Sequence, residues 1–529
     1  MIAFHGKHLI GAERRGGTAT FAATDALDGG TLEGRFALAS GADADDAVRG
    51  AATAFPTLAA TDGAARGALL EGIADEILAL GGALIERARR ETALPEARLV
   101  GERARTVGQL RLFATIARDG SWCDARIDPA QPARQPLPRA DIRRVKVPVG
   151  PVIVFGSSNF PLAFSVAGGD TASALATGNP VVVKAHRGHP GTSEMVAEAV
   201  QRAVAKAGLP PGTFSMLHGA GATVGVALVE HPLAAAVGFT GSRAGGRALV
   251  DAAARRTHPI PVFAEMSSLN PLFILPGALA TRGDSIAAGF VASMTLGVGQ
   301  FCTKPGLVVA VEGADLARFR GALAAAVGLA PPGRMLTGEI LAAYRRGCDR
   351  LLGDAHTSLL AGRTTGEHDR DAVPLVATTS AASFLGEGHL GDEVFGPASL
   401  VVSAATRDEL LTLARHLDGQ LTATVHGTPA DLAEAADLMA ILATKAGRLI
   451  VNGFPTGVEV GHAMHHGGPW PAASDPRFTS VGGAALDRFV RPVCYQDVPE
   501  GLLPAALRDA NPLGLLRLVD GRPTRDAIG

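Results

Sequence analysis

The sequence predicts an α/β protein with doubly wound parallel sheets. Short, continuous apolar runs alternate with helical segments over residues 151–266, and a second α/β-like series starts at 271 and runs to about 455. Strands that are apolar throughout are typical of a parallel sheet with both faces covered by helices. At 529 residues the chain is also too long for one ordinary hydrophobic core, so two or three domains are expected.

Two segments precede the first series. Residues 45–118 are expected to be helical, because their apolar residues recur at helical spacing. Residues 127–142 hold four prolines and cannot continue a helix, so they are expected to run as an extended excursion into the strand-like residues 143–150.

The first series is expected to form one parallel sheet with helices between its strands. Its predicted strands cover 151–156, 180–185, 213–219, 234–241 and 261–266. Its predicted helices cover about 161–177, 190–208, 222–230 and 242–256. The second series includes predicted strands at 271–276, 307–313, 399–405 and 447–453, and the chain becomes irregular after 470.

Composition argues against several function classes. The 49 basic and 51 acidic residues nearly balance, and no Lys/Arg run carries interleaved aromatics, so nucleic acid is not an expected partner. The N-terminus has no signal-peptide h-region, and no apolar stretch reaches the roughly 18 residues of a membrane span. The cysteines lie far apart without a CxxC pair, which indicates a reduced, cytoplasmic protein without a metal site.

One residue could act as a nucleophile, and a second could stabilise the oxyanion that its attack creates. Cys302 lies in the loop GQFCTKPG, whose glycines expose backbone N–H groups that can favour a thiolate; the alternative is a small buried filler. Asn159 follows a predicted strand directly, where its amide can donate to a developing oxyanion. Its alternative role is to form a turn or cap a helix.

A second group of residues could hold a cofactor. Lys184 ends a predicted buried strand and could bond a ribose or phosphate, while the charges of His186 and Arg187 could favour a ribose 2′-phosphate. Gly241 and Ser242 lie in a strand–helix turn that can cradle a pyrophosphate, although the stricter GxGxxG pattern is absent. Alternatively, Lys184, His186 and Arg187 are solvated surface residues that bind no cofactor.

Three further motifs bear ionisable or aromatic groups. Glu265 ends an apolar strand and is a candidate general base, with a raised pKa if partly buried. Glu393 and Phe395 lie in the turn DEVFGP, for which a simple acidic loop is the alternative. His466 lies in HHGGPWPA, where a histidine is usually a satisfied loop residue.

Taken together and in order, these motifs resemble the aldehyde dehydrogenase superfamily over roughly residues 20–495. The resemblance rests on the PxxxFxxxNFP segment, the lysine, the FTGS turn, a glutamate ahead of an xNP triplet, GQxCT thirty-seven positions later, and ExFGP. It implies a Cys302 nucleophile that forms a thiohemiacetal and then a thioester, with Asn159 and the Cys302 backbone N–H as oxyanion hole. Glu265 would activate the deacylating water.

The resemblance also implies a cofactor site and a domain plan. Lys184 and Glu393 would hold riboses, Gly241 and Ser242 the pyrophosphate, and Phe395 would flank the nicotinamide. The expected parts are a cofactor-binding domain (1–130 and 149–270), a catalytic domain (271–470), an oligomerisation arm (131–148 and 471–500) and a C-terminal extension of unknown role (501–529). A homodimer or homotetramer is expected.

The chain departs from most relatives at two places. Glu265 is followed by Met-Ser-Ser-Leu instead of Leu-Gly-Gly-Lys, and the usual Lys-Pro-x-Glu is replaced by Lys184-Ala-His-Arg187. With an arginine in place of the glutamate that accepts from the 2′-hydroxyl of NAD, NADP is preferred over NAD as the expected cofactor.

The variants KAHxxHPGTSE and HGGPxPA resemble one branch of the superfamily. That branch contains 2-oxoglutarate semialdehyde (2,5-dioxopentanoate) dehydrogenases and NADP-dependent fatty aldehyde dehydrogenases, and in it the histidine of HGGP, here His466, is implicated in catalysis. The preferred activity is oxidation of 2-oxoglutarate semialdehyde to 2-oxoglutarate. The alternatives are a medium- or long-chain aliphatic aldehyde dehydrogenase, an acylating dehydrogenase that uses coenzyme A, against which Glu265 argues, and a catalytically silent binding protein.

Overall fold

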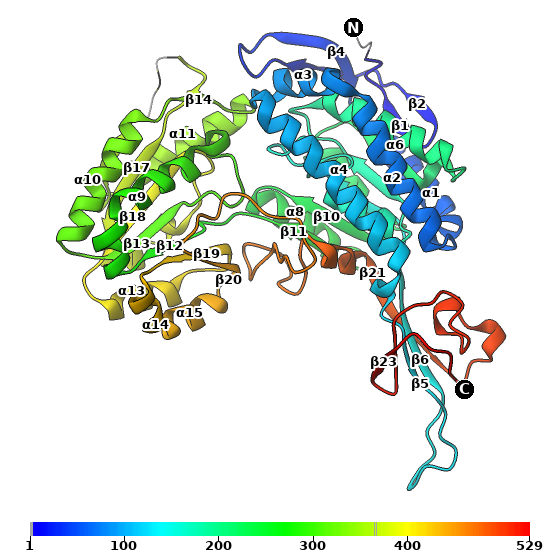
Figure 1. The fold of residues 1–529 in the computed structure, drawn as a ribbon. Coiled ribbons are helices and arrows are strands. Elements are labelled where there is room, and N and C mark those ends of the chain that lie inside the picture. Colours follow the sequence, from blue (N-terminus) through cyan, green and yellow to red (C-terminus); the bar gives the residue numbers. More distant parts are fainter. Residues whose placement is uncertain (1–3, 364–365, 367, 529) are drawn as a thin grey trace.

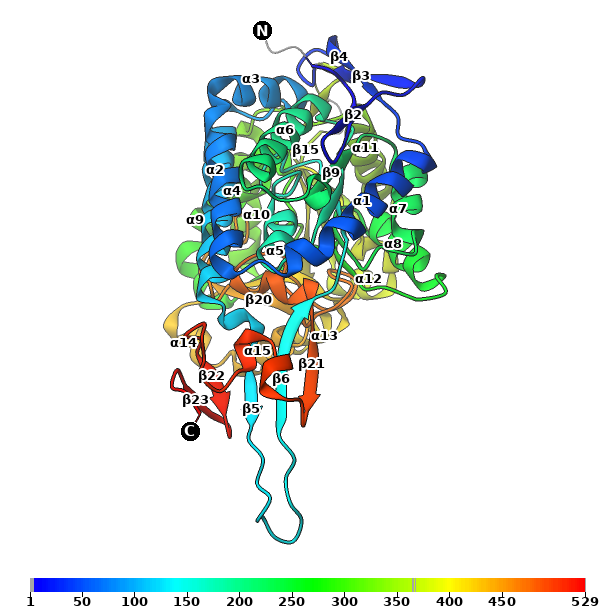
Figure 2. The ribbon, with the colours of Figure 1, turned by 90° about the vertical axis from the view of Figure 1, so that its right-hand side faces the viewer.

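The chain forms two α/β lobes and a projecting arm in a computed structural model, which describes residues 4–363, 366 and 368–528 (Figure 1). Each lobe is built on a seven-stranded sheet, and the arm contains a five-stranded sheet. Seen from the side, the arm extends away from both lobes (Figure 2). The predicted α/β fold with parallel sheets is confirmed.

The first sheet has the strand order β11-β10-β7-β8-β9-β1-β2. Its parallel strands are β7 (Val152–Phe155), β8 (Val181–Lys184), β9 (Phe214–Leu217), β10 (Ala236–Thr240) and β11 (Val262–Glu265), and each lies inside a predicted run. The antiparallel strands β1 (His8–Ile10) and β2 (Glu13–Arg15) extend one edge. The chain turns outward in both directions from β7, so the switch point lies between β7 and β10, where doubly wound sheets bind ligands.

Helices cover both faces of this sheet. They are α1 (Gly41–Ala59), α2 (Gly63–Ala79), α3 (Gly81–Thr92), α4 (Glu96–Asp119), α5 (Gly169–Ala176), α6 (Pro190–Lys206), α7 (Val226–Glu230) and α8 (Arg243–Ala254). The hairpin β3 (Thr20–Thr24) and β4 (Thr31–Ala37) lies beside them. Short helical turns occur at η1 (Ser121–Cys123), η2 (Pro211–Thr213) and the π-turn η3 (Gly221–Gly225).

The helix expected over 161–177 is wrong in its first half, because α5 begins only at Gly169. The Glu102 carboxylate accepts hydrogen bonds from the backbone N–H groups of Leu162 and Ala163, at 2.9 and 3.0 Å. The preceding loop folds back as well, since Ser157 N–H donates to the Phe164 carbonyl at 2.9 Å. A carboxylate from α4 thus satisfies donors at a turn, and the local apolar pattern gives no sign of it.

The second sheet has the order β15-β17-β18-β13-β12-β19-β20. Its parallel strands are β12 (Leu272–Ile274), β13 (Leu307–Val311), β17 (Leu375–Ser380), β18 (Ala398–Ala404), β19 (Gln420–His426) and β20 (Ala446–Val451); β15 (Ser358–Gly362) is antiparallel. Its helices are α9 (Pro276–Thr295), α10 (Ala314–Leu329), α11 (Gly338–Leu352), α12 (Ala381–Gly386), α13 (Arg407–His416), α14 (Pro429–Ala433) and α15 (Ala436–Ala443). The turns η4 (Leu296–Gly299) and η5 (Gly388–Gly391) and the pair β14 (Gly333–Arg334) and β16 (Asp371–Ala372) complete this lobe.

The arm sheet has the order β21-β6-β5-β22-β23. Its strands are β5 (Arg126–Asp128), β6 (Ile142–Pro148), β21 (Val490–Gln496), β22 (Arg517–Val519) and β23 (Arg522–Thr524), with η6 (Gly483–Phe489), η7 (Glu500–Leu502) and η8 (Ala505–Leu507) nearby. The C-terminal segment therefore adds two strands to the same sheet. It also packs Leu503, Leu507 and Leu515 against Ile127 and Val145.

None of the helices in the described residues combines the length and apolarity that a bilayer crossing requires.

Candidate active site

A large cleft opens at the carboxyl ends of β7, β8 and β10, at the switch point of the first sheet. Its volume is about 1090 Å³, and its lining includes all five residues that the sequence indicated for this end of a cofactor: Lys184, His186, Arg187, Gly241 and Ser242. The second lobe contributes Thr337 and Gly338 from the start of α11, which sequence reasoning missed. A cleft of this size between two lobes is large enough for a dinucleotide.

Lys184 ends β8 and is only 7% exposed. Burial and, next, the charge of Arg187 lower the pKa of its ammonium to about 8. The side chain therefore keeps its charge at neutral pH and presents a cation at the rim of the cleft.

His186 and Arg187 differ in charge and in exposure. Burial, with nearby His189 and Lys184, lowers the pKa of His186 well below its usual value, so the expected positive charge of His186 is wrong. Its Nδ1 accepts a hydrogen bond from Gly188 N–H at 3.0 Å, and its ring stacks on His189 with centroids 5.4 Å apart. Arg187 is exposed, and its guanidinium carbon lies 5.1 Å from the centroid of the Phe21 ring. Only Arg187 of this pair carries positive charge into the cleft.

Gly241 and Ser242 form the turn between β10 and α8. Gly241 N–H donates to the Glu265 carbonyl at 3.0 Å, and the Ser242 hydroxyl accepts from Gly245 N–H at 3.2 Å, which caps α8. A Cβ at position 241 would lie 2.7 Å from the Phe239 ring. The turn thus requires glycine, and it directs a helix N-terminus at the cleft, which suits a pyrophosphate.

A smaller cavity of about 430 Å³ continues from this cleft, with which it shares Thr240, Gly241 and Ser242. Its lining brings together Asn159, Glu265, Cys302, Glu393 and Phe395, which come from both lobes.

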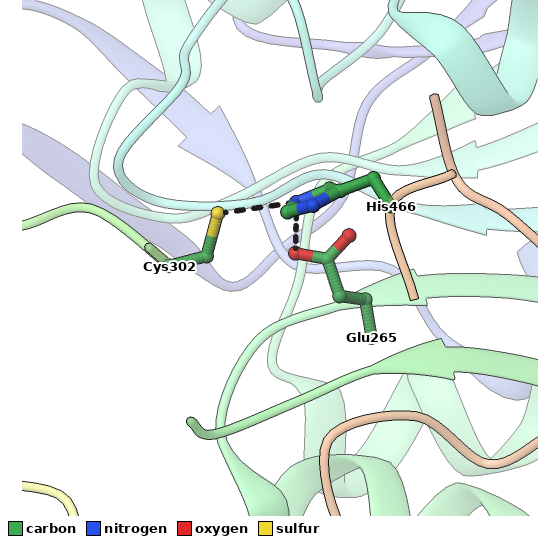
Figure 3. A group of neighbouring side chains, drawn as sticks. All are labelled: Glu265, Cys302 and His466. Carbon is green, nitrogen blue, oxygen red and sulfur yellow. Dashed lines mark hydrogen bonds and ion pairs between the residues drawn. The ribbon is translucent and has the colours of Figure 1, made fainter. Parts of the chain in front are cut away.

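Cys302, His466 and Glu265 contact one another in this region (Figure 3). His466 Nε2 lies 3.4 Å from the Cys302 sulfur and 3.1 Å from a Glu265 carboxylate oxygen. The other Glu265 oxygen accepts a hydrogen bond from the Ser480 hydroxyl. His466 Nδ1 is buried without a hydrogen-bond partner among the described residues. A proton on Nδ1 would leave a buried donor unsatisfied, so we assign the ring proton to Nε2, between sulfur and carboxylate.

The charges of this triad are coupled. Burial and the Glu265 carboxylate raise the pKa of Cys302 well above its ordinary value, so the resting group is a thiol. Burial acts to raise the pKa of Glu265 too, but His466 and the Ser480 hydroxyl outweigh it and hold that pKa below its ordinary value. The raised pKa expected for Glu265 is therefore wrong, because a buried partner favours the ionised form.

Asn159 and Asn270 hold the loop that carries Cys302. The Asn159 amide donates one hydrogen bond to the Gln300 carbonyl at 2.9 Å, which leaves its second N–H for a ligand. Asn270, in a left-handed conformation with φ of 50°, donates to the carbonyls of Cys302 and Lys304 at 2.9 and 3.0 Å. Sequence reasoning used Asn270 only as part of a motif and missed this role.

Lys304 is a second residue that the sequence reasoning missed. It is 1% exposed, and its ammonium donates to the backbone carbonyls of Ala398 and Val394 at 2.7 and 3.2 Å. It thereby joins the Cys302 loop to the turn that carries Glu393 and Phe395. Burial raises the pKa of Glu393 to about 7, although Lys304 acts to lower it. The sequence did offer a signal for this role, because Lys304 lies only two positions after the candidate nucleophile Cys302.

The triad also offers one sulfur, one nitrogen and one oxygen atom within 4.8 Å of one another, a donor set of the kind that binds Zn²⁺. A half-buried surface group of Asp354, Glu387 and His389 has similar spacing.

Comparisons with known proteins identify the family. The model of the aldehyde dehydrogenase family matches residues 16–470. The chain is 55% identical over 519 residues to alpha-ketoglutaric semialdehyde dehydrogenase 2 of Azospirillum brasilense, which covers 98% of this chain and 99% of the relative. It is 46% identical over 524 residues to alpha-ketoglutaric semialdehyde dehydrogenase of Acinetobacter baylyi, with 99% of each chain covered.

Solved structures support the fold. The structure of betaine aldehyde dehydrogenase from Staphylococcus aureus in complex with NAD+ matches with a TM-score of 0.80 at 20% identity, covering 93% of this chain and 95% of that one. A 3,6-anhydro-L-galactose dehydrogenase matches with a TM-score of 0.78 at 21% identity over 93% of this chain and 99% of that one. The chain belongs to the aldehyde dehydrogenase family and is an aldehyde-oxidising enzyme.

Proposed function

We propose that this enzyme oxidises 2-oxoglutarate semialdehyde to 2-oxoglutarate, with Cys302 as the nucleophile. The contact of Cys302 with the His466–Glu265 pair, at the inner end of a dinucleotide-sized cleft, carries the proposal. Two relatives at 55% and 46% identity bear the name alpha-ketoglutaric semialdehyde dehydrogenase, which supports this choice of aldehyde.

The first step requires a proton acceptor, because the thiol form of Cys302 is favoured at rest. The thiol proton passes to the Glu265 carboxylate, which lies within 4.8 Å of the sulfur, directly or through one water. His466 Nε2–H then donates to the thiolate as the sulfur attacks the aldehyde carbon. The free N–H of Asn159 and the Cys302 backbone N–H donate to the oxygen that becomes negative.

The remaining steps return the thiol. Phe395 would flank a bound nicotinamide, which would supply the hydride acceptor needed for the thiohemiacetal on Cys302 to become a thioester. Glu265 first releases to solvent the proton that it took from the thiol. Its carboxylate then takes a proton from the water that attacks the thioester carbonyl, the carbon–sulfur bond breaks, and that proton returns to the leaving sulfur.

We propose that NADP is preferred over NAD, while aldehyde dehydrogenases as a family use either. Lys184 and Glu393 would hold riboses, and the Gly241–Ser242 turn the pyrophosphate. Arg187 is an exposed cation at the cleft and suits a 2′-phosphate. His186 is neutral, so it is proposed only as a neighbour of that phosphate site.

The expected domain plan, the cytoplasmic location and a homodimer or homotetramer joined through the arm remain part of this proposal. The five-stranded arm sheet lies outside both lobes and is available for contacts between subunits (Figure 2).

The test is a kinetic panel of the purified protein with both cofactors. 2-Oxoglutarate semialdehyde should give the highest kcat/KM, ahead of aliphatic aldehydes of medium and long chain, and NADP should exceed NAD. A higher kcat/KM for long-chain aldehydes would favour the fatty aldehyde alternative, and the absence of any NAD(P)H formation would overturn the proposal.

A further inference from the structure

Arg105 on α4 is a cation that forms no ion pair among the described residues. Its Nε and Nη2 atoms are buried, and neither has a hydrogen-bond partner among the described residues. Burial lowers the pKa of this guanidinium, yet arginine keeps its charge over the whole working pH range. A buried, unpaired charge is costly to keep, so a ligand that neutralises it is the natural explanation.

The neighbouring arginines differ because their charges or donors are engaged. Arg98, about two turns before Arg105 on the same helix, pairs with Glu102. Arg448 donates to the carbonyls of Pro455 and Gly457 at 2.7 and 3.1 Å and so holds a loop. Among these three arginines, Arg105 alone has no such partner in the part of the chain that the structure describes.

Arg105 lies behind the residues that flank the nucleophile. Its guanidinium carbon is 6.0 Å from the centroid of the Phe160 ring and 5.5 Å from that of Phe164. Phe160 directly follows Asn159 in the chain and packs edge-on against Phe301, with centroids 5.2 Å apart. Phe301 in turn directly precedes Cys302. The cation therefore lies one aromatic layer away from the oxyanion and nucleophile residues, and its field reaches Cys302.

The direction of the substrate follows from the positions of the other groups. The Cys302 cavity, which Glu393 and Phe395 also line, shares Thr240, Gly241 and Ser242 with the cofactor cleft, so the nicotinamide is placed on that side. An aldehyde whose carbonyl reaches Cys302 would extend its chain away from the nicotinamide, and we place that chain along Phe160 and Phe301, which adjoin Asn159 and Cys302 in the sequence and pack against each other. Those rings suit methylene groups, and a guanidinium at their far side suits a carboxylate, which it can bind through two parallel N–H bonds.

We propose that Arg105 binds the carboxylate of an ω-oxo acid whose aldehyde reacts at Cys302. This inference rests on the proposed function and adds to it the residue that distinguishes a semialdehyde acid from an uncharged aldehyde.

The experiment compares 5-oxopentanoate with pentanal, which have the same chain length and differ in the terminal carboxylate. The ratio of their kcat/KM values is measured for the wild type, Arg105→Met, Arg105→Lys and the control Arg111→Met. Arg111 lies on the same helix, is 54% exposed and pairs with Asp75, so its variant should keep the wild-type ratio.

Arg105→Met should lower the ratio by about tenfold or more, because a charge-assisted hydrogen bond is lost only with the acid. The loss should appear mainly in KM for 5-oxopentanoate. Arg105→Lys should retain part of the ratio, since it keeps the charge without the planar fork. Glutarate, used as a non-reactive probe, should compete with 5-oxopentanoate for the wild-type enzyme and should raise the melting temperature of that enzyme. It should have neither effect on Arg105→Met.

Three outcomes would overturn the inference. An unchanged ratio in a folded Arg105→Met would show that another group binds the acid. Equal losses with both aldehydes, together with a shifted pH profile, would show that Arg105 acts only on the thiol. A wild type that oxidises neither aldehyde would overturn the proposed function as well, which the first two outcomes leave intact.

Discussion

The two ends of the cleft are built in opposite ways. At the inner end, Cys302, His466 and Glu265 are in mutual contact, and each alters the protonation of another. At the outer end, Lys184 is buried and Arg187 is exposed, and the two are coupled only through the effect of the Arg187 charge on the Lys184 pKa, which is smaller than that of burial. Groups that act as a unit give non-additive effects when one is removed, whereas separated binding groups contribute independently. The inner end should therefore control rate, and the outer end affinity and cofactor choice.

Cys302→Ala is the most severe test of that contrast. Aldehyde oxidation should fall by about 10⁴-fold or more, because the covalent step has no substitute nucleophile. The dissociation constant for NADP, measured by fluorescence titration, should stay within about twofold, since the sulfur takes no part in holding ribose or phosphate. Appreciable turnover in the purified variant, or a large loss of cofactor affinity, would contradict the separation of roles.

Glu265→Gln should affect both chemical phases at the inner end. Turnover should slow by about 10²- to 10⁴-fold, the usual contribution of a general base, and the pre-steady-state burst of NADPH should slow too, because the same carboxylate accepts the thiol proton of Cys302. Stopped-flow absorbance separates the two phases. A burst at the wild-type rate with slow turnover would show that Glu265 serves the deacylating water alone. If burst and turnover both survive, Glu265 is not the base.

What the sequence could predict depended on distance along the chain. The parallel strands were predictable because a covered sheet needs continuous apolar runs, and each run of the first series contains its strand. The first half of the 161–177 helix was not, because Glu102, some sixty residues away, bonds Leu162 and Ala163. The direction in which the pKa of Glu265 shifts likewise depends on His466 and Ser480, which lie more than 200 positions later in the chain.

The candidate site shows the same limit. Individual motifs named most of its residues, because each motif is local. The structure added what no local pattern contains: the contact between Cys302 and a histidine 164 positions away, and the buried Lys304 that joins two loops. Tertiary contacts of this kind appear only after the two lobes are brought together.

At the outer end, Arg187→Glu should move cofactor preference from NADP toward NAD. The change removes a cation that suits a 2′-phosphate and supplies an acceptor for a 2′-hydroxyl. A charge-assisted hydrogen bond is worth about 1.5–3 kcal/mol, so the ratio of kcat/KM for the two cofactors should shift about tenfold or more. His186→Ala is the matched comparison, since His186 is neutral and should leave the ratio nearly unchanged. A ratio within twofold of the wild type for Arg187→Glu would place the preference elsewhere.

The smallest expected effect is a pH dependence of cofactor affinity, which compares one group from each lobe. The pKa of Glu393 is raised to about 7 by burial, so its carboxyl is protonated below that pH and cannot act as an ionised acceptor for a ribose hydroxyl. The pKa of Lys184 is lowered to about 8, so its ammonium is lost above that pH. Affinity for NADP should therefore rise through about pH 7, fall above about pH 8, and be greatest between the two.

The size of the rising limb follows from the titration. Between about pH 6.5 and about pH 7.5, the ionised fraction of a group with a pKa near 7 increases about threefold, and affinity should change by a similar factor. Glu393→Gln should abolish this limb and keep the fall above about pH 8, whereas Asp392→Asn, in the same turn but exposed, should preserve both. The sign for stability is opposite. Because folding raises the pKa of Glu393 from 4.5 to about 7, its contribution to stability falls as pH rises from about 4.5 to about 7 and is level above that. Isothermal titration across this range, with thermal melts of the same samples, measures both slopes, and a cofactor affinity that is flat in the wild type would remove Glu393 from the ribose site.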